Sequence, residues 1–380
     1  MHIRFARSAR STVGIEWELH LVDKSTGELV PAAEKLIALT HGGDDKPIRK
    51  EYLPCAIEIV SRPRAIIAEA IADIRHHVDI LMEAAESIGV ALMGAGSHPF
   101  SRSATQTPFR TSRYDAVTHR NGWWGRQMAI CGTHVHVGVA DRSHVLPLAW
   151  SQALSYPFLL ALSASSPFWE GEDSGFASQR TMMFQQLPTN GLPHRFDSWE
   201  EYENHVDDLV ACGVITQVQE MRWDVRPSPN FGTVENRIPD SVPTVAELGF
   251  VAAATQCLSE DIERRLDDGH APAQTPPWLI RENKWRVARH GLDATVIQPG
   301  ESGVRTTPLR EAMVRWLDAL MPVADDLGCA RELAFGYEML THGASYERQR
   351  RIAARSGLRA LVDAIAHETA SGVPSWTGEE

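Results

Sequence analysis

The chain has 380 residues, of which 43% are hydrophobic and 23% charged, an ordinary composition for a soluble protein of one or two domains. A formal net charge of −12 argues against a general nucleic-acid-binding protein, because phosphate backbones are held by clusters of Lys and Arg. No apolar run approaches the roughly 20 residues of a membrane helix, so we expect no membrane span and a cytoplasmic protein. The five cysteines are scattered singly, which favours reduced thiols.

The first predicted element is a β-strand over residues 12–22, in which polar and apolar side chains alternate. Successive side chains of a strand point to opposite faces, so Glu16, Glu18 and His20 share one face, and the other face is apolar. Two carboxylates and an imidazole then stand in a row at steps of about 6 to 7 Å, which suits divalent cations. Taken alone, the pattern is more typical of a solvated sheet face.

Three further predicted strands also have one polar and one apolar face. They are predicted within residues 51–63, 131–141 and 233–238. Their polar faces carry Glu58, His134, His136, Glu235 and Arg237. A short buried strand without such residues is expected to begin at residue 90.

Helices are predicted where apolar residues recur at helical spacing. The N-terminal ones cover residues 32–39, 65–89, 145–165 and 198–213, and the last begins with a capping-box pattern at Ser198. Residues 101–124 are expected to be irregular with one short helix, and residues 167–191 form a long loop of the kind that often carries function. From residue 244 onward the chain is predicted to be mostly helical, in segments at 244–268, 279–289, 308–326, 330–343, 345–355 and 358–370.

The four polar-faced strands together point to a site. If they lie in one antiparallel sheet with helices over the apolar side, the other side gathers charged groups from distant parts of the chain. Carboxylates in one place repel and raise one another's pKa values unless cations neutralise them. The set therefore predicts a Mg²⁺ or Mn²⁺ site, and the neighbouring arginine favours phosphate. The set comprises Glu16, Glu18, Glu58, His134, His136, Glu235 and Arg237.

Other interpretations of single residues stay open at this point. His134 and His136 are also compatible with zinc, although the excess of carboxylates and the lack of cysteine partners favour an oxygen-preferring ion. Arg180, Lys284 and Arg286 fit surface charges as well as a binding role, and Arg180 gains weight from its place in the long loop. The sequence contains no Walker loop, Ser-His-Asp arrangement or nucleophile elbow.

Seven successive motifs resemble those of the bacterial carboxylate-amine ligase family, relatives of type 2 glutamate-cysteine ligases. They are GIEWELHLVD, EYLPCAIEIV, GAGSHPF, CGTHVHVG, ALSASSPFWEGEDSGFASQR, WDVRPSPNFGTVENRIPDS and ENKWRVARHGLDA, in order through about nine-tenths of the chain. The resemblance implies an α+β fold of the glutamine synthetase and guanido-kinase type. In that fold, a curved antiparallel β-sheet has helices on its outer face and binds ATP and Mg²⁺ on its concave face.

The resemblance also implies the domain organisation and the roles of matching residues. It predicts a single catalytic domain over residues 1–375, mostly helical from about residue 244, and a homodimer. The metal carboxylates would be Glu16, Glu18, Glu51, Glu58 and Glu235. His134 would lie beside the nucleotide phosphates, assisted by His136, and Arg237 would contact phosphate during its transfer. Arg180 and Arg226 would hold a substrate carboxylate or phosphate.

The implied reaction is phosphorylation of a carboxylate by ATP to an acyl phosphate, which an amine attacks. We expect catalysis by positioning and electrostatics, without a covalent enzyme intermediate. The default carboxylate is the γ-carboxylate of glutamate, and the amine is open, cysteine included. The alternatives are a phosphotransferase that stops at phosphorylation and a non-catalytic binder of nucleotide or amino acid. Four residues beside the metal carboxylates depart from the family's common residue types and leave the substrate pair open: Trp17, Ala56, Asn236 and Pro239.

Overall fold

The computed structural model describes residues 2–109, 120–300 and 303–378. Its main sheet is antiparallel and has the strand order β10-β11-β5-β1-β3-β2, with β4 paired to the C-terminal part of β1. The first strand is therefore central and pairs with three others. The strands of this sheet are β1 (Val13–Asp23), β2 (Ile48–Lys50), β3 (Ala56–Val60), β4 (Val90–Met93), β5 (Thr133–Gly138), β10 (Val225–Ser228) and β11 (Thr233–Asn236).

Most helices lie where the sequence predicts them. Their bounds are α1 (Ala33–Thr40), α2 (Ile67–Glu86), α4 (Arg142–Leu154), α5 (Tyr156–Ser163), α6 (Gln179–Phe184), α7 (Trp199–Ala211), α8 (Val245–Asp267), α9 (Pro277–His290), α10 (Leu309–Leu327), α11 (Ala330–His342) and α12 (Ser345–Ser371). The predicted cap of α7 is formed, because the Ser198 hydroxyl accepts a hydrogen bond from the Glu201 N–H at 3.1 Å. In α12 the backbone leaves the helical conformation at Gly357, which separates the two predicted segments.

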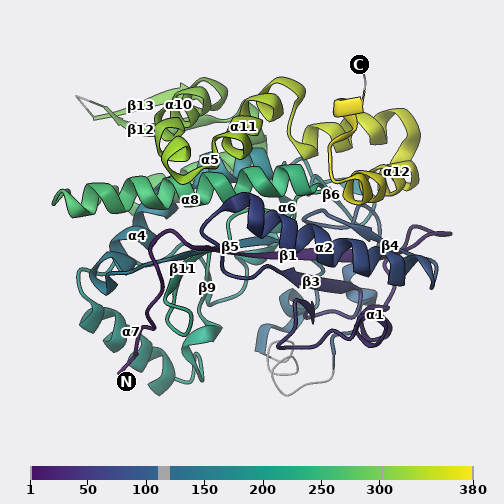
Figure 1. Ribbon diagram of the computed structural model, residues 1–380, viewed down its shortest axis with the longest axis horizontal. Helices are drawn as coiled ribbons and strands as arrows, with labels where there is room; N and C mark the ends of the chain where they lie inside the picture. The colour runs from purple at the N-terminus through teal and green to yellow at the C-terminus, as the bar shows by residue number, and fades with distance from the viewer. Residues whose placement is uncertain (1, 110–119, 301–302, 379–380) are drawn as a thin grey trace.

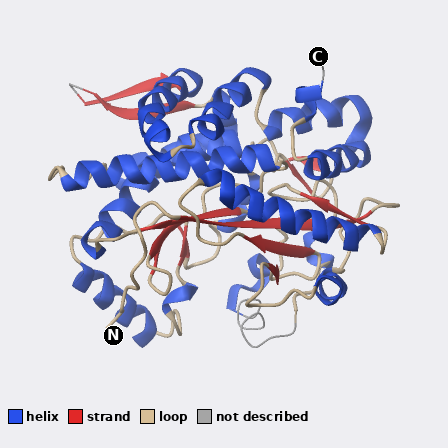
Figure 2. Cartoon of the chain, viewed as in Figure 1, coloured by secondary structure: helices blue, strands red, loops and turns tan. Residues whose placement is uncertain are grey.

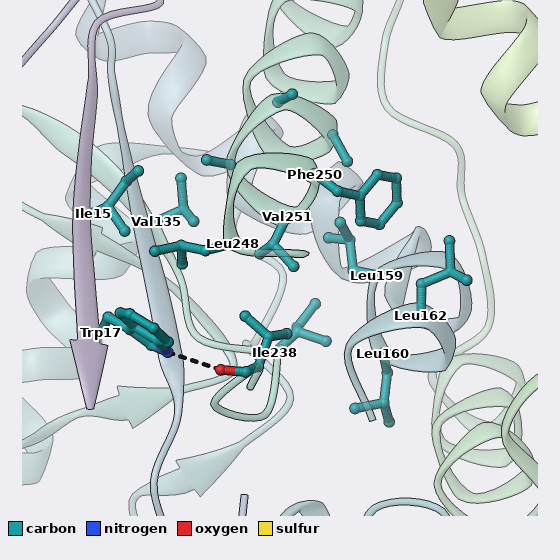
Figure 3. Packing of buried hydrophobic residues seen from close by; sticks show 14 of the residues in the cluster. Ile15, Trp17, Val135, Leu159, Leu160, Leu162, Ile238, Leu248, Phe250 and Val251 are labelled. Atoms are coloured by element: carbon teal, nitrogen blue, oxygen red, sulfur yellow. Dashed lines mark hydrogen bonds between the residues drawn. The ribbon is translucent and has the colours of Figure 1, made fainter. Parts of the chain in front are cut away.

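Helices α2 and α8 lie along one face of the main sheet (Figure 1). The apolar side chains of β1 point toward this layer, and Ile15 and Trp17 are fully buried. Figure 3 shows these two residues and Val135 of β5 near Leu248 and Val251 of α8, within one core cluster. Burial of the apolar strand face under helices removes it from water and leaves the polar face on the other side. The predicted α+β fold class is confirmed.

The predicted helix over residues 145–165 is wrong in one respect, because it is divided. Helices α4 and α5 meet at Ser155 with a bend of 58°. Pro157, in the first turn of α5, has no N–H to donate, and its ring would clash with the backbone carbonyl one turn before it. The first helix therefore ends before Pro157, and a new helix begins there. Within the described residues, no single helix is long and apolar enough to cross a membrane. Only this bent pair, taken together, has the length and the apolar composition of a membrane span. The apolar side chains of both helices are part of the core.

A β-hairpin lies in the region that the sequence predicts to be mostly helical. It consists of β12 (Thr295–Gly300) and β13 (Gly303–Pro308), between α9 and α10, and it stands apart from the main sheet (Figure 2). Its strands are rich in Thr, Val and Ile, whose branched side chains favour extended backbone. Other short strands are β6 (Phe168–Trp169), β7 (Glu172–Asp173), β8 (Asn190–Gly191) and β9 (Arg222–Trp223).

The region predicted to be irregular with one short helix is only partly described. It contains the 3₁₀ turn Ser103–Thr105, and residues 120–125 are helical. Residues 110–119 lie outside the described part of the chain.

Candidate active site

The register of the main sheet brings the predicted site residues together on the face opposite the core. Glu16 of β1 lies opposite His134 of β5, and Glu18 lies opposite Glu58 of β3. Glu235 is on β11, which pairs with β5. These side chains are shielded from solvent: Glu18, His134 and Glu235 are 8%, 2% and 1% exposed. The structure therefore excludes a solvated sheet face, and a burial this deep requires partners for the charges.

Two histidines bridge the carboxylates. His134 Nδ1 lies 3.1 Å from Glu16 Oε2, and His134 Nε2 lies 3.6 Å from Glu18 Oε1. His136 Nε2 lies 3.3 Å from Glu16 Oε1 and 3.9 Å from Glu235 Oε2. Within the described part of the chain, His134 Nε2 is buried and makes no hydrogen bond. A buried ring nitrogen in this state is available to a ligand.

Carboxylate and imidazole atoms form three groups that could each hold a metal ion. The atoms of each group lie within 4.8 Å of one another. Oxygen donors outnumber nitrogen donors across the groups, and none contains a cysteine, so the donor set fits Mg²⁺ or Mn²⁺ better than zinc. The groups are Glu16 with His136 and Glu235, Glu16 with Glu58 and His134, and Glu18 with Glu51 and Glu58.

The electrostatics of these carboxyl groups also fit a cation site. Burial and the neighbouring Glu51 raise the pKa of Glu18 to about 8. Burial and the surrounding carboxylates raise the pKa of Glu58 well above its ordinary value. Burial opposes ionisation of Glu16 too, but hydrogen bonds from the two histidines hold its pKa well below the ordinary value. A divalent cation would displace the protons that the raised pKa values retain.

The three predicted arginines are close to this cluster. Arg237 pairs with Glu235, and its Nη1 lies 3.4 Å from His134 Nδ1. Arg226 Nε donates to Glu235 Oε2 at 2.7 Å, while its Nη1 donates to two backbone carbonyls. Burial opposes the charge of Glu235, but the two guanidinium groups hold its pKa far below the ordinary value. Arg180, the second residue of α6, is buried and lines the same pocket.

Most of the cluster lies in the wall of a pocket of about 1170 Å³, which His136 and Glu235 do not line. This volume can accommodate a nucleotide together with a small second substrate. A smaller pocket of about 110 Å³ adjoins it and shares Glu16, Gln219 and Arg226 with it. The outer walls of the large pocket carry both cations and aromatic rings from loops and short elements, where no periodicity marks them in the sequence: Arg49, Lys50, Phe109, Phe184 and Arg222.

Lys284 is a buried residue, not a surface charge. It is 3% exposed, and its Nζ lies 2.6 Å from Asp224 Oδ2. The carbonyl of Asp224 accepts a hydrogen bond from the Arg237 N–H at 2.8 Å. The Lys284–Asp224 ion pair therefore stabilises the backbone next to Arg237. Helical spacing gives a signal for this burial, because Lys284 shares one face of α9 with Ile280 and Val287.

The four departures from the family's common residue types do not line the large pocket. Trp17 is fully buried, and its indole N–H donates to the carbonyl of Val242 at 3.0 Å (Figure 3). Asn236 Nδ2 donates to Gln152 Oε1 at 2.8 Å within the core. These two departures therefore belong to the packing behind the carboxylates, and they do not shape the substrate pocket directly.

Comparisons with known proteins identify the family of the chain. The model of glutamate-cysteine ligase family 2 matches residues 12–364. A protein of Leifsonia xyli subsp. xyli with the name "Putative glutamate--cysteine ligase 2" is 44% identical, over 98% of this chain and 99% of its own. A similarly named protein of Nocardia farcinica is 45% identical, over 96% of this chain and 97% of its own.

A solved structure shows the same fold at low sequence identity. The glutamate-cysteine ligase of Francisella tularensis, in complex with AMP, has a TM-score of 0.69 and 13% identity over 97% of this chain and 89% of that chain. The family model and the two relatives each cover most of the chain. The chain therefore belongs to glutamate-cysteine ligase family 2 and is an ATP-dependent carbon–nitrogen ligase.

Proposed function

We propose that the protein uses ATP to phosphorylate the γ-carboxylate of glutamate and then joins the resulting acyl phosphate to an amine. One observation carries the proposal: carboxylates and imidazoles from four antiparallel strands, together with Glu51 beside β2, meet three arginines along two adjoining pockets. A site with this donor set suits metal-bound phosphates. The named relatives are glutamate-cysteine ligases by description, and they support glutamate as the carboxylate substrate.

The proposed metal ligands are the residues whose donor atoms converge. Mg²⁺, or Mn²⁺ in the same sites, would neutralise the triphosphate and the charge that develops on the transferred group. The Nε2 of His134, which makes no hydrogen bond within the described residues, and the raised pKa values of Glu18 and Glu58 support this assignment. The ligand set comprises Glu16, Glu18, Glu51, Glu58 and Glu235, with His134 and His136 beside the phosphates.

The arginines supply the remaining positive charge. Arg237 is held beside His134 by Glu235, and in this position it stabilises charge on the phosphoryl group during transfer. Arg226 fixes Glu235 from the other side and faces the pocket. Arg180 is buried in the pocket wall and binds an anionic group of a substrate.

The proposed reaction can be tested by following one oxygen atom. The attacking carboxylate oxygen forms a bond to the γ-phosphorus as ADP leaves, and amine attack then breaks the C–O bond and releases that oxygen in phosphate. Glutamate labelled with ¹⁸O in the γ-carboxylate, incubated with the enzyme, Mg·ATP and a panel of amines that includes cysteine, should give one labelled oxygen per phosphate. Mass spectrometry of phosphate and amide measures both products.

The outcomes separate the proposal from its alternatives. Labelled phosphate together with an amide supports the ligase and identifies the amine. A phosphorylated product that accumulates and resists every amine would establish a phosphotransferase. Binding of Mg·ATP without ADP formation for any carboxylate would overturn the proposed activity in favour of a non-catalytic role. The homodimer remains a prediction that sedimentation would check.

A further inference from the structure

The Arg180 side chain enters the pocket wall beside Gly132. A Cβ atom at Gly132 would lie 2.2 Å from Arg180 Nη2, so a side chain there would displace the guanidinium from this position. The side chain makes two long hydrogen bonds, of 3.4 Å to the carbonyl of Ile238 and 3.3 Å to that of Arg237. In the described part of the chain its Nε is buried without an acceptor. These contacts alone hold the guanidinium weakly.

Asp240 is the carboxylate closest behind this guanidinium. Its side chain is fully buried, and its Oδ1 lies 3.8 Å from Arg180 Nη1. Three donors from two other segments hold the carboxylate, and we call them the serine cradle: the Ser178 hydroxyl at 2.8 Å from Oδ1, and the Ser165 N–H and Ser166 hydroxyl at 2.9 and 2.7 Å from Oδ2. The cradle therefore fixes the position of the charge that faces Arg180.

The serine cradle is also joined to the Arg180 backbone. The Arg180 N–H donates to the Ser166 hydroxyl at 3.0 Å, and that hydroxyl donates to Asp240. Ser178 is the N-cap of α6, the helix on which Arg180 lies. The backbone and the guanidinium of Arg180 are thus both linked to the Asp240 carboxylate.

Asp240 has no other evident function in the site. Among the described residues, it belongs to none of the three candidate metal groups and lines neither pocket. Burial of an ion this deep is unfavourable unless hydrogen bonds and an opposite charge compensate it. Three donors and Arg180 oppose this cost, although burial still raises the pKa of Asp240. A buried carboxylate retained behind a pocket arginine serves the geometry of that arginine.

We propose that Asp240, held by the serine cradle, is a positioning residue that fixes the Arg180 guanidinium over Gly132 so that its free donors meet an anionic substrate group in one orientation. The inference rests on the proposed function, which makes Arg180 an anion-binding residue. The anionic group is a carboxylate of the amino-acid substrate or a phosphate of the nucleotide. A planar guanidinium recognises both through paired N–H donors, and that recognition depends on orientation.

A double-mutant cycle tests the inference. Asp240→Asn, Arg180→Lys and the double variant are compared with the wild type in kcat and in KM for ATP and for glutamate. Asp240→Asn should raise the same KM as Arg180→Lys, by about 10- to 100-fold. The double variant should be no worse than Arg180→Lys, because a lysine has no fork for Asp240 to orient. A rise confined to the KM of glutamate assigns a carboxylate, and a rise confined to that of ATP assigns a phosphate.

A matched control separates positioning from folding. Glu247 is also a fully buried carboxylate with an arginine and a hydroxyl partner, at 2.8 Å each, but it does not line the pocket. Glu247→Gln should lower stability and leave both KM values within about 2-fold. If Asp240→Asn does not fold, Ser178→Ala, which removes one donor from Oδ1, should raise the same KM by a smaller factor.

Two results would overturn the inference. One is an Asp240→Asn enzyme whose KM values match the wild type after correction for folded protein. The other is a double variant whose losses equal the product of the single losses. If the wild-type protein forms no amide, the proposed function fails separately. A crystal structure of Asp240→Asn still tests whether Asp240 positions Arg180. A guanidinium displaced from Gly132 supports positioning, and an unmoved guanidinium contradicts it.

Discussion

The pocket carboxylates and the Arg348 cluster are two groups of buried charge with opposite organisation. In the Arg348 cluster, which comprises Arg348, Glu247 and Glu368, the guanidinium lies 2.8 Å from Glu247 Oε1 and 3.2 Å from Glu368 Oε2. Further donors from the Thr244 hydroxyl and the Ser375 N–H complete the two carboxylates. Burial still raises the pKa of Glu247, but both carboxylates of this cluster contact one guanidinium and accept a further hydrogen bond within the fold.

The pocket carboxylates, which are Glu16, Glu18, Glu51, Glu58 and Glu235, are balanced unevenly. Two arginines neutralise Glu235, whereas burial and neighbouring carboxylates dominate at Glu18 and Glu58. Burial and mutual repulsion raise the pKa values of these two, and within the described chain the nearby His134 keeps a buried nitrogen that makes no hydrogen bond. A structural ion network closes on itself, whereas a binding site keeps the charge imbalance that its ligand will neutralise. The comparison therefore predicts that mutations in the first cluster act on stability and mutations in the second act on function.

Removal of Arg348 should produce the largest effect, and it should be an effect on stability. Arg348→Met leaves Glu247 and Glu368 buried without their counter-charge, so we expect a loss of about 3–5 kcal/mol in the free energy of unfolding. Urea denaturation followed by circular dichroism measures it. The fraction that remains folded should keep the wild-type KM values, and a changed KM would contradict the division between the two clusters.

Glu16→Gln should have nearly as large an effect, but on activity. Glu16 belongs to two of the three candidate metal groups, so loss of its charge should lower kcat/KM by about 10²- to 10³-fold, or about 2.7–4 kcal/mol. The thermal midpoint of the metal-free protein should fall less than in Arg348→Met, because the amide oxygen of Gln can still accept a hydrogen bond from one of the two histidines that stabilise the carboxylate. Steady-state kinetics with excess Mg²⁺ measures the loss. Wild-type activity in both Glu16→Gln and Glu58→Gln would end the metal-site argument.

The contents of this site were predictable because side-chain alternation in strands is a local property. Glu16 and Glu18 alternate with fully buried apolar residues in β1. In β5, His134 and His136 alternate with buried valines. The pairing of Glu16 with His134 was not predictable, because register depends on how distant strands meet. Glu51 follows a three-residue strand and carries no periodic signal, so only the family resemblance pointed to it.

Other features that depend on tertiary contacts could not be predicted from the sequence for the same reason. Asp240 and the serine cradle come from separate segments, and no spacing between them is diagnostic. The β12–β13 hairpin interrupts a region of strong helical patterns, and its branched residues are too few to outweigh its surroundings in a sequence window. The bend between α4 and α5 was visible in principle at Pro157, which lies inside the apolar run that predicted one helix.

The nucleotide should stabilise the protein by an intermediate amount, and most of this stabilisation should depend on the pocket carboxylates. A non-hydrolysable ATP analogue with Mg²⁺ at about 100 times its Kd should add about 2.7 kcal/mol to the free energy of unfolding. Arg348→Met should gain the same increment from its lower starting point, whereas Glu16→Gln should gain much less. Thermal shift assays with and without EDTA measure both. Equal stabilisation of all three proteins by the analogue in EDTA would show that the carboxylates do not bind the nucleotide through a metal.

Between pH 6 and 7, the pH dependence of the metal-free protein should show the smallest effect. The pKa of Glu18 is raised to about 8 in the folded chain, against about 4.5 in the unfolded chain, so the folded state holds a proton that the unfolded state has released between these values. Stability should therefore fall as pH rises through this window, by at most about 1.4 kcal/mol per pH unit for one proton. Glu18→Gln removes this titration, so its free energy of unfolding should fall less steeply than that of the wild type between pH 6 and 7 in EDTA. Parallel pH profiles would mean that the pocket carboxylates are as fully compensated within the fold as the Arg348 cluster.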